Sequence, residues 1–526
     1  MKYVKKYDTH LNYEADEREY KELDLCEDEW HVHITNVEPN RLRFIATQNS
    51  STIAFNKISS YSTIPAYAQS YYNINLQYSI DSTEDWQEYT WDGNSGLTIT
   101  LQSGSCVYFK GSNELFSYGS ALYHNIKMTG KFLSDGDVTS LLNEIGGAIP
   151  LTASFYGLFS GCEGLITPPK LPSKTLSNTC YQLMFNGCSS LTDMPELPAS
   201  ELAIQCYCAM FSGCSSLTGI TSLNATVMTD DCYSNMFRNC TSLVVPPELP
   251  STILAMNCYN SMFRGCSSLA SAPSLPATAM TINCYYSMFR GCYSLIEAPE
   301  LPATALADAC YCEMFFECTS LLSAPELPAT NLYNSCYGYM FYSAISLTYA
   351  SSLNAQTLKP YCYRFMYSYC TSLVNPPYIG ADTTAIESCR AMFAECTSLT
   401  SAPDLMPKTL TQSCYQSMFG GCVNLVNGPI ISCNQVSSSQ ETSDAMYGMF
   451  NGCSKLKSVR MEYNDSRYII NANIYYSGHG GGYRYLHTAM WLQGVASNGS
   501  IYLPTSYSIN NKPASWTVKA LNTYTP

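Results

Sequence analysis

Cysteine is the residue type whose spacing in this sequence is best suited to chemistry. One set recurs every 26 residues, with Ala344 in the single slot that lacks a thiol: Cys162, Cys188, Cys214, Cys240, Cys266, Cys292, Cys318, Cys370, Cys396 and Cys422. A second set lies eight residues before this reference position, as at Cys180, Cys258 and Cys414. Thiols in such numbers could form disulfides, hold zinc or act as nucleophiles.

The spacing argues against all three. Two cysteines eight residues apart on a helix lie about 12 Å apart, and neighbouring helices pack about 8–10 Å apart. Both separations exceed the roughly 4.4–6.8 Å between the Cα atoms of a disulfide. The repeats contain no histidine and no CxxC pair, so they offer neither a zinc site nor a base for a nucleophile. We therefore expect buried free thiols.

A line of arginines is the second candidate for chemistry. Arg238, Arg264 and Arg290 stand two residues before consecutive reference cysteines, and Phe316 and Tyr342 continue the same position in the next two repeats. A cationic row could hold acidic sugars or phosphates, and the aromatic continuation suggests carbohydrate recognition. The alternative is a solvated face that duplication has copied. All five residues are candidate ligand-binding residues.

The other repeated positions predict the element that carries these side chains. Leucine always follows the cysteine by three, while Met and Phe precede it by four and three; Cys188, Leu191, Met262, Phe263, Cys266 and Leu269 represent this predicted repeat core. Apolar residues at i, i+1, i+4, i+5 and i+8 predict a short amphipathic helix. The segment after it, which ends at a proline, predicts a short strand. The expected fold is an α/β solenoid, leucine-rich-repeat-like, with 26-residue coils of short helix plus short strand, preceded by a small all-β domain.

Four regions follow from these patterns. Residues 1–38 are charged and predict either an N-terminal attachment arm or a disordered tail. Residues 39–130 predict a small β-sandwich, with strands at Leu42 to Ala46, Leu76 to Ile80, Leu97 to Leu101 and Val107 to Lys110. Residues 131–458 hold the repeats. Residues 459–526 contain Trp491, Tyr502 and Trp516 and predict a C-terminal cap, with a ligand-stacking site as the alternative.

Composition narrows the function. The 526 residues carry a net charge of −14, only 13% charged residues and 43 tyrosines, which suits an extracellular or virion surface and disfavours nucleic acid as a partner. No apolar run reaches 18 residues, so we expect no membrane span, and the start does not read as a secretory signal peptide. Paired carboxylates and phosphate-binding glycine loops do not stand out. We expect no enzyme activity, no metal and no cofactor.

The repeat resembles the BspA-like leucine-rich repeats, whose units carry an MFxxCxSL core. That core is seen here from Met184 to Leu191 and from Met262 to Leu269, and the resemblance covers roughly residues 154–458. The family's members are surface adhesins of gut and oral bacteria. Arrays of this kind behind a small β-domain are also similar to tail or appendage proteins of phages that infect Bacteroidota, including crAss-like phages.

The resemblance implies a phage tail-fibre or receptor-binding virion component that presents the repeats for host-cell adhesion. Its partners would be a host surface glycan or protein receptor, and other virion tail proteins through the N-terminal region. A homotrimer is a further hypothesis, although no heptad run supports it. The alternative is a BspA-like adhesin on the bacterial cell surface; the missing signal peptide and anchor favour the virion tail.

Overall fold

The computed structural model describes residues 41–59, 74–90, 96–144, 146–433, 435–436, 445–463, 492–503 and 513–523. The chain divides into two compact units, Met1–Pro39 and Asn40–Pro526, and all the described elements belong to the second. The predicted attachment arm, residues 1–38, and Trp491 of the predicted cap lie outside the described residues.

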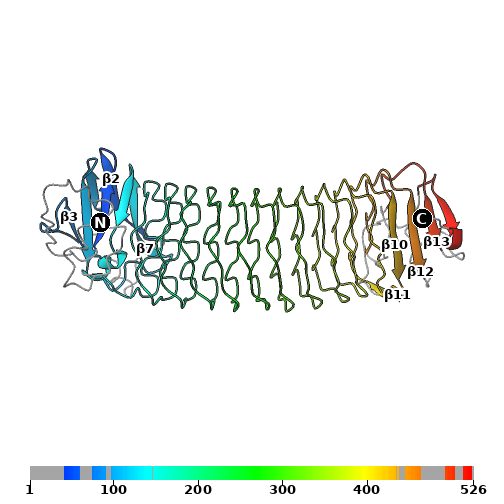
Figure 1. The fold of residues 1–526 in the computed structure, drawn as a ribbon, viewed down its shortest axis with the longest axis horizontal. Helices are drawn as coiled ribbons and strands as arrows, with labels where there is room; N and C mark the ends of the chain where they lie inside the picture. The colour runs from blue at the N-terminus through cyan, green and yellow to red at the C-terminus, as the bar shows by residue number, and fades with distance from the viewer. Residues whose placement is uncertain are drawn as a thin grey trace, which may run out of the picture. The chain divides into compact units, whose positions relative to one another are not determined.

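In the described residues before the repeats, eight strands form two antiparallel sheets (Figure 1). The first sheet has the order β4-β3-β6-β1-β8 and the second the order β5-β2-β7. The strands are β1 (Leu42–Ala46), β2 (Ser51–Ser59), β3 (Asn75–Ile80), β4 (Gln87–Thr90), β5 (Thr98–Leu101), β6 (Cys106–Gly111), β7 (Leu122–Thr129) and β8 (Phe132–Asp135). The four strands predicted here are confirmed, each end within one residue of its predicted position.

Aromatic rings join the two sheets. Alternate residues of β1 and β6 are buried, as period-two strands with one core face require. Phe55 of the second sheet lies 4.9 Å, between ring centroids, from Phe109 of the first, and Phe109 also contacts Phe44. Phe44 in turn meets Phe159 of the first repeat at 5.9 Å, so the sheets and the repeats share one hydrophobic core.

Strands β7 and β8 are the surface on which the first repeat is stacked. The amide of Ile126 in β7 donates to the carbonyl of Leu158 at 2.7 Å, and the amide of Phe132 in β8 donates to the carbonyl of Gly164 at 2.9 Å. A short 3-10 helix, η2 (Val138–Leu141), follows β8, and Asp137 caps its start. The sheets thus satisfy the backbone of a coil that has no preceding repeat.

The prediction of a helix-plus-strand solenoid was wrong. No α-helix occurs in the described residues; the 3-10 helices η2 and η4 (Leu521–Thr523) are the only helical turns there. Each segment written CYxxMFxGC is instead a run of consecutive tight turns (the turn segment hereafter). Figure 1 shows these coils side by side, without helices, between the N-terminal and C-terminal strands.

Two alternating hydrogen bonds hold a turn segment, as the coil that ends at Cys292 illustrates. The amides of Tyr285, Ser287 and Phe289 donate to carbonyls of the next coil at 2.8–3.0 Å. The amides between them donate to the carbonyl three residues back, as Met288 does to Tyr285 at 3.2 Å. Every amide from 283 to 292 is therefore satisfied, half of them by the neighbouring coil.

The error came from the period of the apolar pattern. Positions i, i+4 and i+8 repeat every four residues, whereas an α-helix repeats every 3.6 and drifts by roughly 80° over eight residues. In the turn segment every fourth residue has positive φ, as at Asn283 (54°), Ser287 (51°) and Gly291 (73°). This geometry keeps a strict four-residue pattern on one face, which the drifting helix would not.

The core contains ladders of aromatic side chains. Rings seven residues before the reference position, mostly tyrosine, and rings three before it, mostly phenylalanine, stack on the ring at the same position of the next coil, with centroids 5.3–6.1 Å apart. The reference thiols point into the same core: Cys162 donates to the carbonyl of Ile126, and the later ones donate to the backbone carbonyl 29 residues earlier, as Cys266 does to Phe237 at 3.0 Å. A coil thus buries its apolar face only by meeting its neighbours.

The remainder of each coil pairs in register with the next through isolated parallel bridges, such as Glu297 with Ser323 and Asn331 with Thr357. Among the described residues of the repeats, regular strands begin near the C-terminal end, where β9 (Thr409–Leu410) pairs with β11 (Gln435–Val436). A parallel four-stranded sheet ends the chain, with β10 (Asn427–Cys433), β12 (Ser458–Tyr463), β13 (Ser500–Leu503) and β14 (Thr517–Ala520) in that order.

Tryptophan covers this last sheet. Trp516, just before β14, is 1% exposed, and its indole donates to the carbonyl of Ala496 at 2.9 Å. Tyr502 of β13 is 9% exposed. Trp516 belongs to the hydrophobic core and Tyr502 is nearly covered, so neither ring presents an open face for a stacked ligand.

Candidate functional site

The outer face of the turn segments is the part of the repeat whose side chains change most. We define it as the positions six, five, two and one before the reference position, which alternate with the core positions. In the coil of Cys292 these are Tyr286 and Arg290, which are half-buried, and Ser287 and Gly291, which neighbouring residues cover. The buried positions keep nearly one residue type throughout, while the outer face changes from coil to coil. Differences in recognition can arise only where the side chains differ.

The predicted arginine row lies on this face. Arg238 and Arg264 are half-buried, and neither guanidinium forms an ion pair with a carboxylate of the described residues. Burial, followed by repulsion from Arg290 and Arg238, lowers the pKa of Arg264. Arg290 is held differently, since it pairs with Glu313 and its guanidinium carbon lies 3.9 Å from the ring centroid of Phe316.

The structure joins the two predicted aromatics to three others. Phe316 stacks on Tyr342 at 4.6 Å, and Tyr342 meets Tyr369 at 5.3 Å. Tyr339 stacks on Phe365 at 4.9 Å and lies 6.0 Å from Tyr342. These five rings form the aromatic patch. Sequence reasoning followed one position of the repeat and therefore missed the three that lie at the adjoining outer positions.

An ion-pair network borders the patch on the C-terminal side. Arg364 and Arg390 both pair with Glu387, at 3.3 and 3.0 Å. The guanidinium carbon of Arg364 also lies 5.4 Å from the ring centroid of Phe365 and 5.8 Å from that of Tyr339. Glu387 balances much of the positive charge there, so the patch is bordered by partly compensated charges.

Backbone strain marks the same coils. The position before the reference residue has positive φ, which favours glycine, and glycine or asparagine occupies it in most repeats: Gly161, Gly187, Gly213, Asn239, Gly265, Gly291, Gly421 and Gly452. Four consecutive coils carry other side chains there, namely Glu317 (59°), Ser343 (58°), Tyr369 (62°) and Glu395 (60°). Left-handed backbone costs an ordinary L-residue roughly 1–2 kcal/mol. Ordinary residues with positive φ also occur four and eight residues earlier throughout the repeats, as at Leu183 and Thr179, so these four coils differ from the others only at the position before the reference residue.

The predicted core residues are structural. Cys188, Leu191, Met262, Phe263, Cys266 and Leu269 are all 0% exposed. The described cysteines are free thiols, and burial raises the pKa of the Cys188 and Cys266 thiols to about 12. At neutral pH these thiols are protonated and out of reach of solvent, so they are poor nucleophiles.

Metal ligands and histidine are the other residue types considered for chemistry. No group of three or more His, Cys, Asp or Glu residues there is arranged to hold a metal. His124 of β7 is buried, its Nδ1 lies 2.9 Å from the carbonyl oxygen of Phe116, and burial lowers its pKa to about 4. A neutral, buried imidazole of this kind is a core residue.

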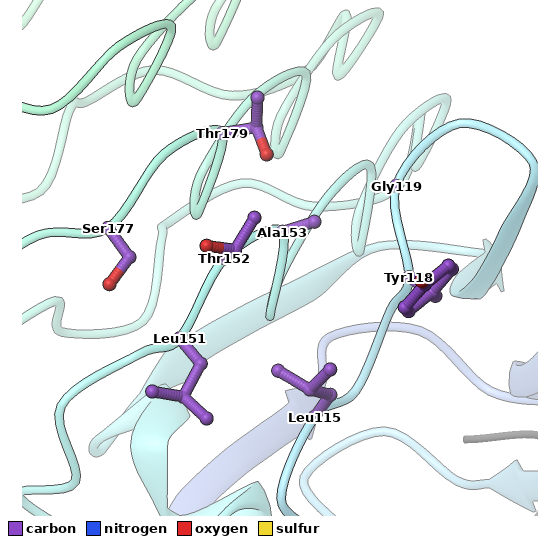
Figure 2. Close-up of a pocket in the computed structure, with 8 residues that line it drawn as sticks. All are labelled: Leu115, Tyr118, Gly119, Leu151, Thr152, Ala153, Ser177 and Thr179. Atoms are coloured by element: carbon purple, nitrogen blue, oxygen red, sulfur yellow. The ribbon is translucent and has the colours of Figure 1, made fainter. Parts of the chain in front are cut away.

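Two hollows lie on the described coils, lined by residues that precede the outer-face positions in the repeat. One, of about 480 Å³, lies where the loop before β7 meets the first coil, and Figure 2 shows Leu115, Tyr118 and Leu151 among the residues that line it. The other, of about 970 Å³, lies on the same coils as the aromatic patch. Its lining is polar: Asp308, Thr330, Asn331, Leu332, Tyr333, Asn334, Asn354, Gln356, Thr357 and Lys359. No sequence argument had singled out either hollow.

Comparison with known proteins assigns no family. No protein-family model matches the sequence, and a search of curated proteins finds no match. Among the described residues, no helix has the length and apolar character that crossing a bilayer needs. The function must therefore be argued from the outer face.

Proposed function

We propose that this chain is a receptor-binding component of a phage tail that adheres to the host cell through the outer face of its repeats. The observation that carries the binding role is the aromatic patch, in which five rings from three consecutive coils meet outside the core. Glutamate, serine and tyrosine replace the favoured glycine in four coils at and next to this patch. These replacing side chains are half-buried or exposed, so they are open to contact with a partner.

The composition of the patch supports the same role. Aromatic and arginine side chains are enriched where proteins bind macromolecules, and tyrosine offers a large contact area at low cost in conformational entropy. Tyr342 and Tyr369 add hydroxyls at the edge of the patch, and Arg364 adds a guanidinium. The virion assignment rests on the sequence resemblance, and a bacterial surface adhesin is the second candidate.

Mass spectrometry of purified phage particles and of washed host envelopes from one infected culture separates these two candidates. Enrichment of the peptides in particles supports a virion component. Peptides confined to envelopes, and present in uninfected cells too, would make the chain a bacterial adhesin.

Binding of the purified protein to host envelopes tests the outer face. The double variant Tyr342→Ala, Tyr369→Gly should bind at least about tenfold more weakly, a loss of about 1.4 kcal/mol. Tyr378→Ala is the matched control, because Tyr378 is 66% exposed but lies outside the patch. Equal binding by all three proteins would exclude the patch. Hydrolysis of capsular polysaccharide by the purified protein would instead indicate an enzyme.

A further inference from the structure

The polar hollow differs from the aromatic patch in leaving a ring face open. The patch rings cover one another: Phe316 lies between Arg290 and Tyr342, and Tyr339 is covered by Phe365. Tyr333, which lines the hollow, is 48% exposed and stacks on no ring of the described residues. An exposed aromatic face is what a flat apolar ligand surface needs.

The repeat itself indicates that this tyrosine is exceptional. Across the ten coils whose reference positions run from Cys188 to Cys422, the position eleven residues earlier is Ser, Ala or Thr in all but two. The two exceptions, Tyr333 and Lys359, are in adjacent coils and line the same hollow. The stacking of one coil on the next needs only a small residue at this position. We therefore connect the two large side chains with the hollow that they line.

Amide side chains surround Tyr333. Asn331, Asn334, Asn354 and Gln356 line the hollow, and each amide carries both donors and an acceptor. Such groups match vicinal hydroxyls, each of which donates one hydrogen bond and accepts others. Asp308 and Lys359, the charged residues of the lining, contribute one negative and one positive charge, so the hollow is neutral overall.

The hollow is held in place by the coils. Leu332 is 2% exposed and anchors the backbone beside Tyr333 in the core. The carboxylate of Asp308 accepts a hydrogen bond from the amide of Asn334 at 2.9 Å, which ties one coil to the next. A site on such a fixed backbone loses little entropy when a ligand binds.

We propose that this hollow is a saccharide-binding subsite that takes an uncharged pyranose of a host surface glycan. The apolar face of the sugar ring lies on Tyr333, and its hydroxyls bond to the surrounding amides. Two residues after Lys359, Tyr361 contacts Arg364 of the patch border at 5.6 Å, so a glycan chain can continue from the hollow onto the patch. This inference rests on the proposed function, whose receptor it assigns to neutral glycans.

Titration of the full chain with polysaccharides tests the subsite. The probes are three neutral polymers (mannan, galactan and dextran) and an acidic one, polygalacturonate. We expect the wild-type chain to bind at least one neutral polymer, and Tyr333→Ala to weaken that binding by about tenfold or more. Tyr293→Ala should leave it unchanged, because Tyr293 is equally exposed at 48% but does not line the hollow. Circular dichroism verifies that both variants are folded.

The outcomes separate this inference from the proposed function. If Tyr333→Ala binds neutral polymers as well as the wild type, or if only polygalacturonate binds and Arg264→Gln removes that binding, the subsite is excluded. If no polymer binds, the subsite is excluded as well. In each of these cases the proposed function stands if the wild-type chain binds host envelopes and the double variant Tyr342→Ala, Tyr369→Gly binds them more weakly. If the wild-type chain does not bind host envelopes, the proposed function is overturned.

Discussion

Exchanging the residue types at one strained position tests the energetic argument for the site. Gly291 and Glu317 occupy equivalent positions in adjacent coils, with φ of 73° and 59°. Their amides make the same bond to the next coil, at 2.8 and 2.7 Å. We expect Glu317→Gly to raise the free energy of unfolding and Gly291→Ala to lower it.

The magnitude follows from two opposing terms. Left-handed backbone costs an L-residue roughly 1–2 kcal/mol, and the greater freedom of glycine in the unfolded chain returns roughly 0.5–1 kcal/mol of this. Each substitution should therefore change the free energy of unfolding by about 0.5–1 kcal/mol, in opposite directions. A Cβ at Gly291 would meet its nearest atom, the Cα of Gly265, at 3.7 Å, so no steric clash adds to the effect.

Urea unfolding followed by circular dichroism measures both variants. The midpoint should rise for Glu317→Gly and fall for Gly291→Ala, with the same slope as the wild type because the surface exposed on unfolding is unchanged. A fall in the midpoint for Glu317→Gly that matches the fall for Gly291→Ala would refute the reasoning. Glutamate would then be stabilising in its own coil, and the left-handed backbone would carry no net cost at that position.

Three further predictions concern the core and the patch border. Phe289→Ala removes one ring from a buried ladder and should cost about 3–5 kcal/mol in urea unfolding; a loss below 1 kcal/mol would show that the neighbouring rings close the gap. Burial raises the pKa of Cys188 from 9.0 to about 12, so its neutral thiol contributes stability that is complete below pH 9 and is lost as the pH rises toward 12. Urea midpoints measured from pH 7 to 10.5 should therefore fall only above pH 9. A fall between pH 7 and 8 would contradict this. Glu313→Gln removes the partner of Arg290, but both side chains are partly exposed, so the free energy of unfolding should change by less than about 1 kcal/mol; a larger change in thermal or urea unfolding would mean that the pair supports the fold.

The buried positions were predictable because burial repeats. A side chain such as Cys266 or Phe263 recurs every 26 residues with the same neighbouring residue types. Only a residue that packs against its own copy in the next coil needs to keep its type in this way. The N-terminal strands were predictable for a related reason, since β1 and β6 alternate apolar and polar residues with one face toward the core.

The conformation of the turn segments could not be read from the pattern alone. Apolar residues such as Tyr285, Met288 and Phe289 suit a short helix by type, and the difference between periods of 3.6 and 4 is small over nine residues. What decides against the helix is the neighbouring coil, whose carbonyls accept every second amide. A helix would use all its amides internally and leave those carbonyls without partners.

By itself the sequence determined that 26-residue units stack, which side chains face inward, and that a row of arginines and aromatics lies along one line. Only the tertiary structure decided which outer residues come together, because Tyr342 and Tyr369 become neighbours through the stacking of coils. The hollow around Tyr333 is likewise assembled from three coils. Periodicity reports what a residue shares with its copies; a binding site depends on how it differs from them, and on which differences the stacking brings into contact.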